Sequence, residues 1–128
     1  MQLLESGEMY LETILILSEQ QPCVRSVDVA NYTGYSKPSV SRAVNLLKDN
    51  GYIAIDDFGY ITLKESGRAV ATRIYQRHRL LTEFLMLLGV NAETAEEDAC
   101  KIEHDISDES FARICEHVER YRPQIPTE

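Results

Sequence analysis

Two residues between positions 26 and 49 restrict the backbone more than any others nearby. Pro38 has no amide proton, so inside a helix it fits only in the first turn. Gly34 follows residues with helical spacing, and glycine favours the left-handed conformation that often follows a helix. Together they predict a helix that ends near Gly34, a tight turn at residues 35–36 and a second helix over residues 37–49.

The side chains of both predicted helices fit a packed helix-turn-helix. Ser26 can cap the first helix, and Asp28 suits the positive end of its dipole. Asn50-Gly51 is expected to end the second helix. The residues that we expect to face inward are apolar and recur with helical periodicity: Val27, Val29, Ala30, Val40, Ala43, Val44 and Leu47.

The flanking segments complete a winged helix-turn-helix. An amphipathic helix is expected over residues 8–20, and two β-rich runs in residues 52–63 flank a turn that ends at Gly59. The fold class is therefore mainly α, with a two-stranded wing in a DNA-binding domain of residues 1–63 and a helical domain of residues 64–128. We expect three helices in the second domain, over residues 64–88, 93–106 and 108–121, the last capped by Ser107.

Charge is distributed unevenly along the chain. The net charge of −8, taken alone, argues against a nucleic-acid partner. Residues 22–48, however, contain four basic residues and one acid, whereas residues 91–109 contain eight acids and one lysine. The first segment can therefore meet phosphate, and the second repels anions or holds cations.

The N-terminal end of the second predicted helix carries groups suited to DNA. Hydroxyls bond to phosphates or base edges, arginine can bind guanine through two hydrogen bonds, and a helix N-terminus favours phosphate. A three-helix module used for protein contact is the alternative. Because specific sites usually need two recognition helices about one DNA turn apart, we expect a homodimer on double-stranded operator DNA. The candidate DNA-binding residues are Arg25, Ser36, Lys37, Pro38, Ser39, Ser41 and Arg42.

The sequence ACKIEHD concentrates side chains that can bind metal. On one helix, Cys100, Glu103 and His104 would lie within an arc of roughly 100°. Met9 and Glu12 share a face of the first helix, and His78 lies midway along the long one. Taken singly, each residue has an ordinary structural explanation: a core methionine or cysteine, a solvated glutamate, a hydrogen-bonded histidine. Together they form a mixed soft and hard ligand set: Met9, Glu12, His78, Cys100, Glu103 and His104.

The chain resembles a known family of metal-dependent repressors, typified by the diphtheria toxin repressor and the manganese transport regulator. The resemblance covers about residues 6–121. In that family a winged helix binds operator DNA, C-terminal helices form the dimer, and a divalent ion activates DNA binding, usually to repress metal-uptake genes. It rests on the stretches EMYLETI, VRSVDVANYTGYSKPSVSRAVNLLKDNGYI, YITLKESG, RHRLLTEFL and ACKIEHDIS.

The resemblance implies a hybrid ligand set. Met9 and Cys100 match ligands of iron-type members, whereas Glu12 matches a ligand of the manganese type; His78, Glu103 and His104 are common to the pattern. Thr82 and Glu96 replace two ligands of the iron type's ancillary site. Soft sulfur ligands favour Fe(II) slightly over Mn(II) as the activating ion, with Zn(II) or Co(II) able to bind in vitro. The absence of an SH3-like third domain resembles the two-domain manganese regulators.

Other features narrow the setting and the function class. The three cysteines show no CxxC spacing, and no apolar run is long enough for a membrane span, so we expect a cytoplasmic protein. A winged-helix regulator that responds to a small organic effector is the alternative function. A metalloenzyme is disfavoured, because Glu103-His104 does not form an HExxH motif and no phosphate loop or nucleophile elbow occurs.

Overall fold

The computed structural model describes residues 5–122, which are mostly helical. The chain divides into two compact units between Ile74 and Tyr75, within one helix. The elements in chain order are α1 (Glu5–Gln20), α2 (Ser26–Thr33), α3 (Lys37–Asp49), β1 (Ile53–Ile55), β2 (Ile61–Leu63), α4 (Glu65–Leu87), α5 (Ala92–Ile102) and α6 (Asp108–Tyr121). This order confirms the predicted winged helix-turn-helix followed by helices.

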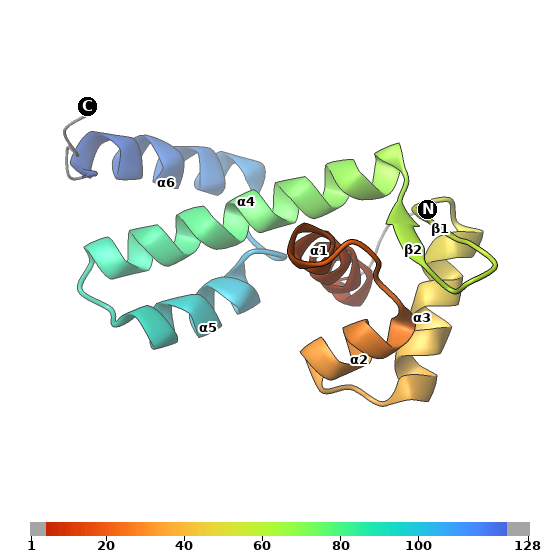
Figure 1. The fold of residues 1–128 in the computed structure, drawn as a ribbon. Coiled ribbons are helices and arrows are strands. Elements are labelled where there is room, and N and C mark those ends of the chain that lie inside the picture. Colours follow the sequence, from red (N-terminus) through yellow and green to blue (C-terminus); the bar gives the residue numbers. More distant parts are fainter. Residues whose placement is uncertain (1–4, 123–128) are drawn as a thin grey trace, which may run out of the picture. The chain divides into compact units, whose positions relative to one another are not determined.

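The first unit has its core where α1 packs against α2, α3 and β2 (Figure 1). Apolar side chains at helical spacing on these helices are removed from water, and this burial is the main favourable term in folding. Ala43 is half-buried, but Val27, expected to face inward, is 41% exposed. The completely buried side chains include Leu11, Ile14, Val29, Val40 and Ile53.

The helix-turn-helix forms as Gly34 and Pro38 predict. Gly34 has φ +79°, and its amide donates to Ala30 O over 2.9 Å, which closes the end of α2. Ser36 is the N-cap of α3, and its hydroxyl accepts a hydrogen bond from the Ser39 amide. The expected cap at Ser26 was wrong: Ser26 is already helical, Arg25 is the N-cap, and its amide donates to the Asp28 carboxylate over 2.8 Å.

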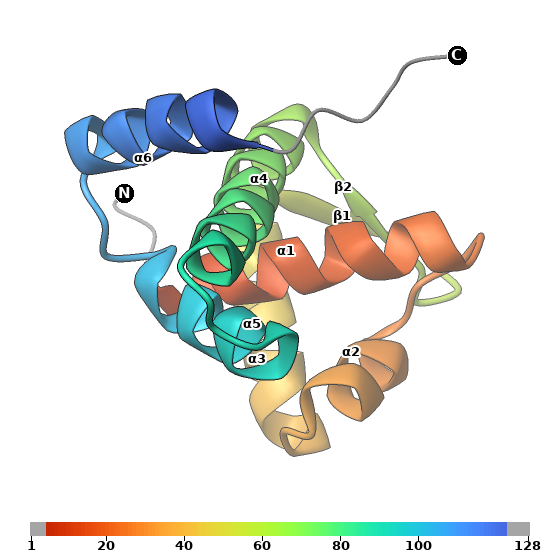
Figure 2. The same ribbon diagram turned by 90° about the vertical axis from the view of Figure 1, so that its left-hand side faces the viewer.

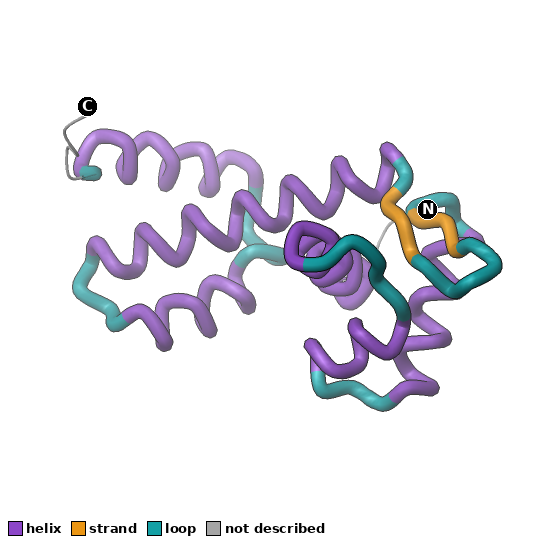
Figure 3. Tube along the Cα trace, in the orientation of Figure 1, coloured by secondary structure: helices purple, strands orange, loops and turns teal. Residues whose placement is uncertain are grey.

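The wing is a two-stranded antiparallel hairpin, drawn in orange in Figure 3. Ile53 pairs with Leu63 and Ile55 with Ile61. The Asp56 carboxylate accepts hydrogen bonds from the amides of Phe58 and Tyr60, each 2.9 Å long, and Gly59 has φ +83°. The acidic turn therefore holds its own backbone, as aspartate side chains often do in turns.

The start of α4 is fixed to the segment between α3 and the wing. The Lys64 amide donates to Tyr52 O over 3.0 Å, and the Ser66 hydroxyl donates to Gly51 O over 2.9 Å. Gly67 lies so close that a Cβ atom there would be 2.1 Å from Tyr52 O. Only glycine allows this approach of helix and backbone.

The second unit contains the C-terminal part of α4 with α5 and α6, which lie on opposite sides of α4 in Figures 1 and 2. Gly89, with φ +104°, follows α4, as expected. Ser107 caps α6 by accepting from the Ser110 amide over 3.1 Å. The helix expected over residues 93–106 is shorter, since α5 ends at Ile102 and residues 103–106 form a turn.

Candidate metal centre and DNA-binding surface

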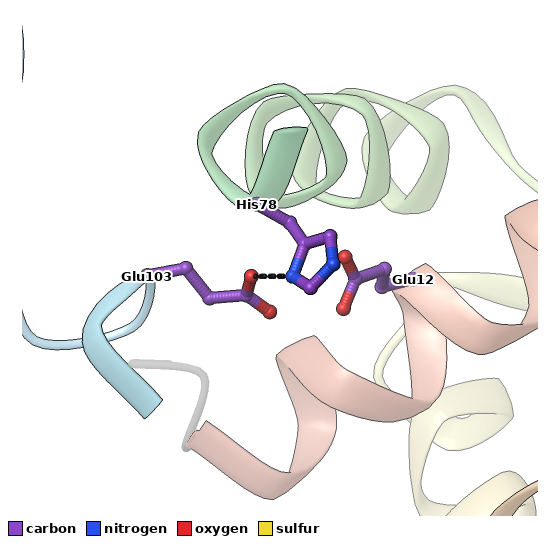
Figure 4. Close-up of side chains that lie close together, drawn as sticks. All are labelled: Glu12, His78 and Glu103. Carbon is purple, nitrogen blue, oxygen red and sulfur yellow. Dashed lines mark hydrogen bonds and ion pairs between the residues drawn. The ribbon is translucent and has the colours of Figure 1, made fainter. Parts of the chain in front are cut away.

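A buried carboxylate meets an imidazole in the second unit. His78 projects from α4, and Glu103 directly follows α5 as its C-cap residue. The distance from His78 Nδ1 to Glu103 Oε2 is 2.8 Å (Figure 4). The Glu103 side chain is 0% exposed, and that of His78 is 18% exposed. Such burial is costly for a charged carboxylate unless its oxygens find partners.

A second imidazole reaches the same carboxylate. His104 Nε2 lies 3.3 Å from Glu103 Oε1, and the His104 side chain is 2% exposed. Within the described residues, Oε1 still has no hydrogen-bond partner. Glu96 is more distant, with Oε1 3.8 Å from His78 Nε2, and its side chain is mostly exposed. Glu103 is therefore placed between two histidines with one oxygen unsatisfied.

This arrangement fits a divalent metal ion. Imidazole nitrogens and a carboxylate oxygen are common ligands of first-row transition metals. A buried polar atom without a partner needs an explanation, and an ion bound by Oε1 would provide one. His78, Glu103 and His104 are the residues of the second unit that would hold the ion.

The cysteines differ in their suitability as ligands. Cys100 belongs to α5, one helical turn before His104, and the residue is exposed. It stays a predicted ligand. On α6, burial and then Glu119 raise the pKa of the Cys115 thiol, which therefore stays protonated at neutral pH. Since metals bind the thiolate, this favours leaving Cys115 out of the ligand set.

The remaining predicted ligands lie on α1 in the first unit. Met9 is half-buried, and its carbonyl accepts a hydrogen bond of 2.9 Å from the Thr13 hydroxyl. Glu12 is buried, at 7% exposed. Both therefore lie on the covered side of α1, as the i and i+3 spacing predicts. Their role as metal ligands stays a prediction.

Glu83 and Thr82, neighbours in α4, are both engaged in hydrogen bonds. Both Glu83 carboxylate oxygens accept hydrogen bonds from Arg122, over 2.8 and 2.9 Å. The Thr82 hydroxyl donates to His78 O over 2.7 Å. In this structure, therefore, Glu83 is bound to the end of α6, and Thr82 is bound to the backbone of its own helix.

Sequence reasoning missed Arg77, a buried arginine beside His78. Its Nη1 donates to Ile106 O over 2.8 Å, and its Nη2 contacts the Asp108 carboxylate. An arginine in an amphipathic helix is usually on the solvated face, so spacing alone gave no sign of this role. Its position next to a predicted ligand was the signal available in the sequence.

The predicted DNA-binding residues of α3 are gathered at its N-terminal end. The Ser36 hydroxyl donates to Ser39 Oγ over 2.9 Å, and Arg42 Nη2 donates to the same atom over 3.4 Å. Lys37, Pro38, Ser41 and Arg42 are exposed, whereas Ser39 is partly covered. The end of α3 thus presents hydroxyls and cations to solvent, the groups that phosphates and base edges bind.

Two aromatic contacts accompany these residues. The guanidinium carbon of Arg25, which is exposed, lies 4.7 Å from the centre of the Tyr60 ring in the wing. Tyr35, in the turn before α3, meets Tyr10 of α1 edge-on, with ring centroids 6.2 Å apart. Burial raises the pKa of Tyr10, so its hydroxyl is neutral at physiological pH. These contacts hold Arg25 against the wing and the turn against α1.

Models of known families match most of the chain. Residues 2–57 match the iron dependent repressor N-terminal DNA binding domain, and residues 64–124 match the iron dependent repressor metal binding and dimerisation domain. The chain belongs to the iron-dependent repressor family. This family comprises DNA-binding transcriptional repressors, not enzymes, and its metal-binding domain supports a metal effector over a small organic one.

Curated relatives share the family architecture over most of their length. An HTH-type transcriptional regulator MntR from Geobacillus thermodenitrificans is 32% identical over 117 residues, covering 91% of this chain and 83% of the relative. An uncharacterised HTH-type transcriptional regulator from Methanocaldococcus jannaschii is 31% identical over 123 residues, covering 94% and 98%. The likeness therefore extends across both units.

Solved structures show the same fold. The manganese regulator SloR matches with a TM-score of 0.79 and 30% identity, over 88% of this chain and 53% of that one. A manganese-dependent transcriptional repressor in complex with manganese matches with a TM-score of 0.81 and 29% identity, over 95% and 62%. The chain thus spans between half and two thirds of these solved chains. Among residues 5–122, no helix is both long and apolar enough to cross a membrane.

Proposed function

We propose that this chain is a metal-activated transcriptional repressor that controls metal-uptake genes from the cytoplasm. It binds operator DNA as a homodimer when Fe(II) or Mn(II) is bound. The observation that carries the proposal is the buried Glu103 carboxylate between His78 and His104, with Oε1 unsatisfied. Membership of the iron-dependent repressor family supports the link from this site to DNA.

The proposed ligand set is the one that the resemblance to the family implies. His78, Glu103 and His104 hold the ion, Cys100 adds a thiolate, and Met9 and Glu12 complete the set from α1. In the proposed mechanism, the acidic ligands repel one another when no metal is bound. An ion with two positive charges removes this repulsion, and its tighter binding to the DNA-competent state shifts the population toward that state. A coupling of about 1–3 kcal/mol is typical of such linkage.

The domain roles follow the same proposal. Residues 1–63 bind DNA, through Arg25 and the N-terminal end of α3, and residues 64–128 bind metal and dimerise through their helices. Exposed apolar side chains in the second unit are candidates for burial in a dimer interface, because apolar residues favour association. They are Met86, Leu87, Leu88 and Ile102.

The identity of the activating metal rests on the sulfur ligands. Met9 and Cys100 are soft, and soft ligands favour Fe(II) over Mn(II). Zn(II) and Co(II) would bind in vitro, because affinity for first-row ions rises along the Irving–Williams order irrespective of the signal. We therefore propose Fe(II) ahead of Mn(II) as the physiological ion.

Fluorescence anisotropy on the chain's own upstream promoter DNA tests the proposal. Protein is titrated without oxygen, in reductant, with chelator, Mn(II) or Fe(II), at one fixed salt concentration, since salt alone changes such affinities. We expect tight binding with one metal and weak binding with chelator. The double variant Glu103→Gln with His104→Ala should lose the metal response, whereas Arg42→Ala should lose DNA binding and keep metal binding. Equal binding by the unsubstituted protein with metal and with chelator would contradict metal activation.

A further inference from the structure

Arg77 is a buried cation on α4, immediately before the proposed ligand His78. Its side chain is 6% exposed, although arginine is almost never buried without partners. Together with Glu12 and Glu103, it is one of the buried charged residues among positions 5–122. The neighbouring Arg79 is exposed on the same helix. Burying a guanidinium requires a specific set of contacts, and these indicate what Arg77 does.

The contacts of Arg77 fall on the connection between α5 and α6 and on the first turn of α6. Nη1 donates to Ile106 O over 2.8 Å and more weakly to Glu103 O over 3.4 Å. Nη2 contacts the Asp108 carboxylate at the start of α6, and the guanidinium carbon lies 5.1 Å from the centre of the Phe111 ring. One planar group thus touches both ends of the turn that carries Glu103 and His104.

Helix termini explain why an arginine suits this position. The last carbonyls of a helix have no partner within it, and the C-terminal end of its dipole favours a cation. Arg77 places its charge near the end of α5 and donates to two carbonyls that follow this helix, those of residues 103 and 106. The planar guanidinium donates to two acceptors at once in a fixed geometry. The ammonium of lysine does not fix the directions of its hydrogen bonds in this way.

The same contacts constrain the proposed ligands. The backbone carbonyl of Glu103 accepts a hydrogen bond from Arg77. The Glu103 side chain bonds to His78, which follows Arg77 in α4. Because the backbone of Glu103 is held, its carboxylate has little freedom to turn away. His104, the following residue, is oriented by the same turn, with Nε2 3.3 Å from Glu103 Oε1.

We propose that Arg77 is a positioning residue of the metal centre. By binding the turn after α5, it holds the Glu103 carboxylate and the His104 imidazole in the geometry that accepts a divalent ion. The inference rests on the proposed metal-binding function. It assigns Arg77 an effect on metal affinity and on ligand geometry without direct contact with the ion.

Co(II) titration of the full-length protein tests this role, because the visible spectrum of bound Co(II) reports ligand geometry. The variants are Arg77→Met, which keeps length and removes the hydrogen bonds, and Arg77→Lys, which keeps the charge. Arg79→Met is the matched control on the same helix. We expect Arg77→Met to weaken Co(II) affinity roughly 10–100-fold and to alter the spectrum at saturation. The Co(II) affinity of Arg77→Lys should lie between those of Arg77→Met and the unsubstituted protein. Arg79→Met should match the unsubstituted protein in affinity and spectrum.

Several results would overturn the inference. A folded Arg77→Met variant with unchanged Co(II) affinity and an unchanged Co(II) spectrum would overturn it. An Arg77→Met variant that loses thermal stability in chelator, yet gives the original spectrum when saturated with Co(II), would also overturn it. If Arg77→Met does not fold, Arg77→Lys decides on the same two measurements. If the unsubstituted protein binds no Co(II), the proposed metal function fails, and the role of Arg77 fails with it. If the unsubstituted protein and Arg77→Met both bind Co(II) normally, only the role of Arg77 is contradicted, and the proposed metal function stands.

Discussion

At the scale of single residues, the position of Glu103 is the clearest sign of function. The carboxylate is 0% exposed, with Oε2 bonded to His78 and Oε1 3.3 Å from His104 Nε2 but without a hydrogen bond among the described residues, and such burial is costly for a charged group. The spacing in the sequence predicted Glu103 and His104 as candidate ligands. It could not predict that both would be buried in a turn after α5, because that turn is contacted by residues distant in the sequence, among them Arg77, which is 26 residues before Glu103.

Replacing Glu103 with glutamine separates metal binding from folding. We expect Glu103→Gln to lose most of its affinity for Co(II) or Mn(II), because an amide is a far weaker ligand than a carboxylate. In chelator its melting temperature should be equal to or higher than that of the unsubstituted protein, since a neutral group is cheaper to bury. Metal titration and thermal melts check both points, with the exposed Glu97→Gln as control. A large loss of stability in chelator would show that the carboxylate serves the fold.

Cys100 sets the expected metal preference. Cys100→Glu exchanges a soft ligand for a hard one. We expect the ratio of Mn(II) to Co(II) affinity to rise about tenfold or more, because thiolate favours Co(II) and carboxylate favours Mn(II). Competition titrations with both ions measure the ratio, and Cys115→Ser is the control. An unchanged ratio would remove Cys100 from the ligand set.

At the scale of elements, the sequence predicted best where local chemistry decides. Residues 37–49 form α3 as expected, since the Ser36 hydroxyl, the Pro38 ring and the Asn50 amide define its ends locally. The end of α5 was misplaced because Arg77 takes carbonyls of the following turn, and such a distant contact leaves no local pattern. Val27 was expected inside because it is apolar, yet its side of the short α2 is exposed.

Gly67 illustrates a requirement set by packing. In an open helix, Gly→Ala stabilises by about 1 kcal/mol. Here a Cβ atom would lie 2.1 Å from Tyr52 O, so Gly67→Ala should reverse the sign and destabilise the protein by about 1–3 kcal/mol. Urea unfolding measures the free energy of unfolding for this variant and for Arg68→Ala, an exposed neighbour expected to change it by less than about 0.5 kcal/mol. A stabilised Gly67→Ala would show that α4 does not need this close approach.

At the scale of the whole molecule, opposite charges are separated along the chain. The net charge is −8, yet the exposed end of α3 carries Lys37 and Arg42, while the acids concentrate in residues 91–109. Association with DNA therefore depends on a small basic surface, and the remaining charge opposes nonspecific binding. The sequence revealed this separation without any structure, because it depends on residue type and position alone.

Salt dependence measures how many phosphates the basic surface neutralises. If Lys37 contacts one phosphate in each protomer, Lys37→Ala should reduce the slope of log affinity against log salt by about 0.9 per lost contact. Binding should weaken to a similar extent on operators of different sequence, as a backbone contact requires. Anisotropy titrations at several salt concentrations give the slope, and Lys101→Ala in the acidic segment is the control. An unchanged slope for Lys37→Ala would place Lys37 away from the DNA backbone.

The turn after α5 also has a consequence for the timing of regulation. Glu103 and His104 have side chains that are 0% and 2% exposed, on a turn whose carbonyls are held by Arg77. If opening of this turn is needed to release an ion bound by these two residues, the opening rate would limit dissociation. The delay between a fall in metal concentration and the release of a promoter would then be set by local unfolding of this turn, whatever the equilibrium affinity for the metal.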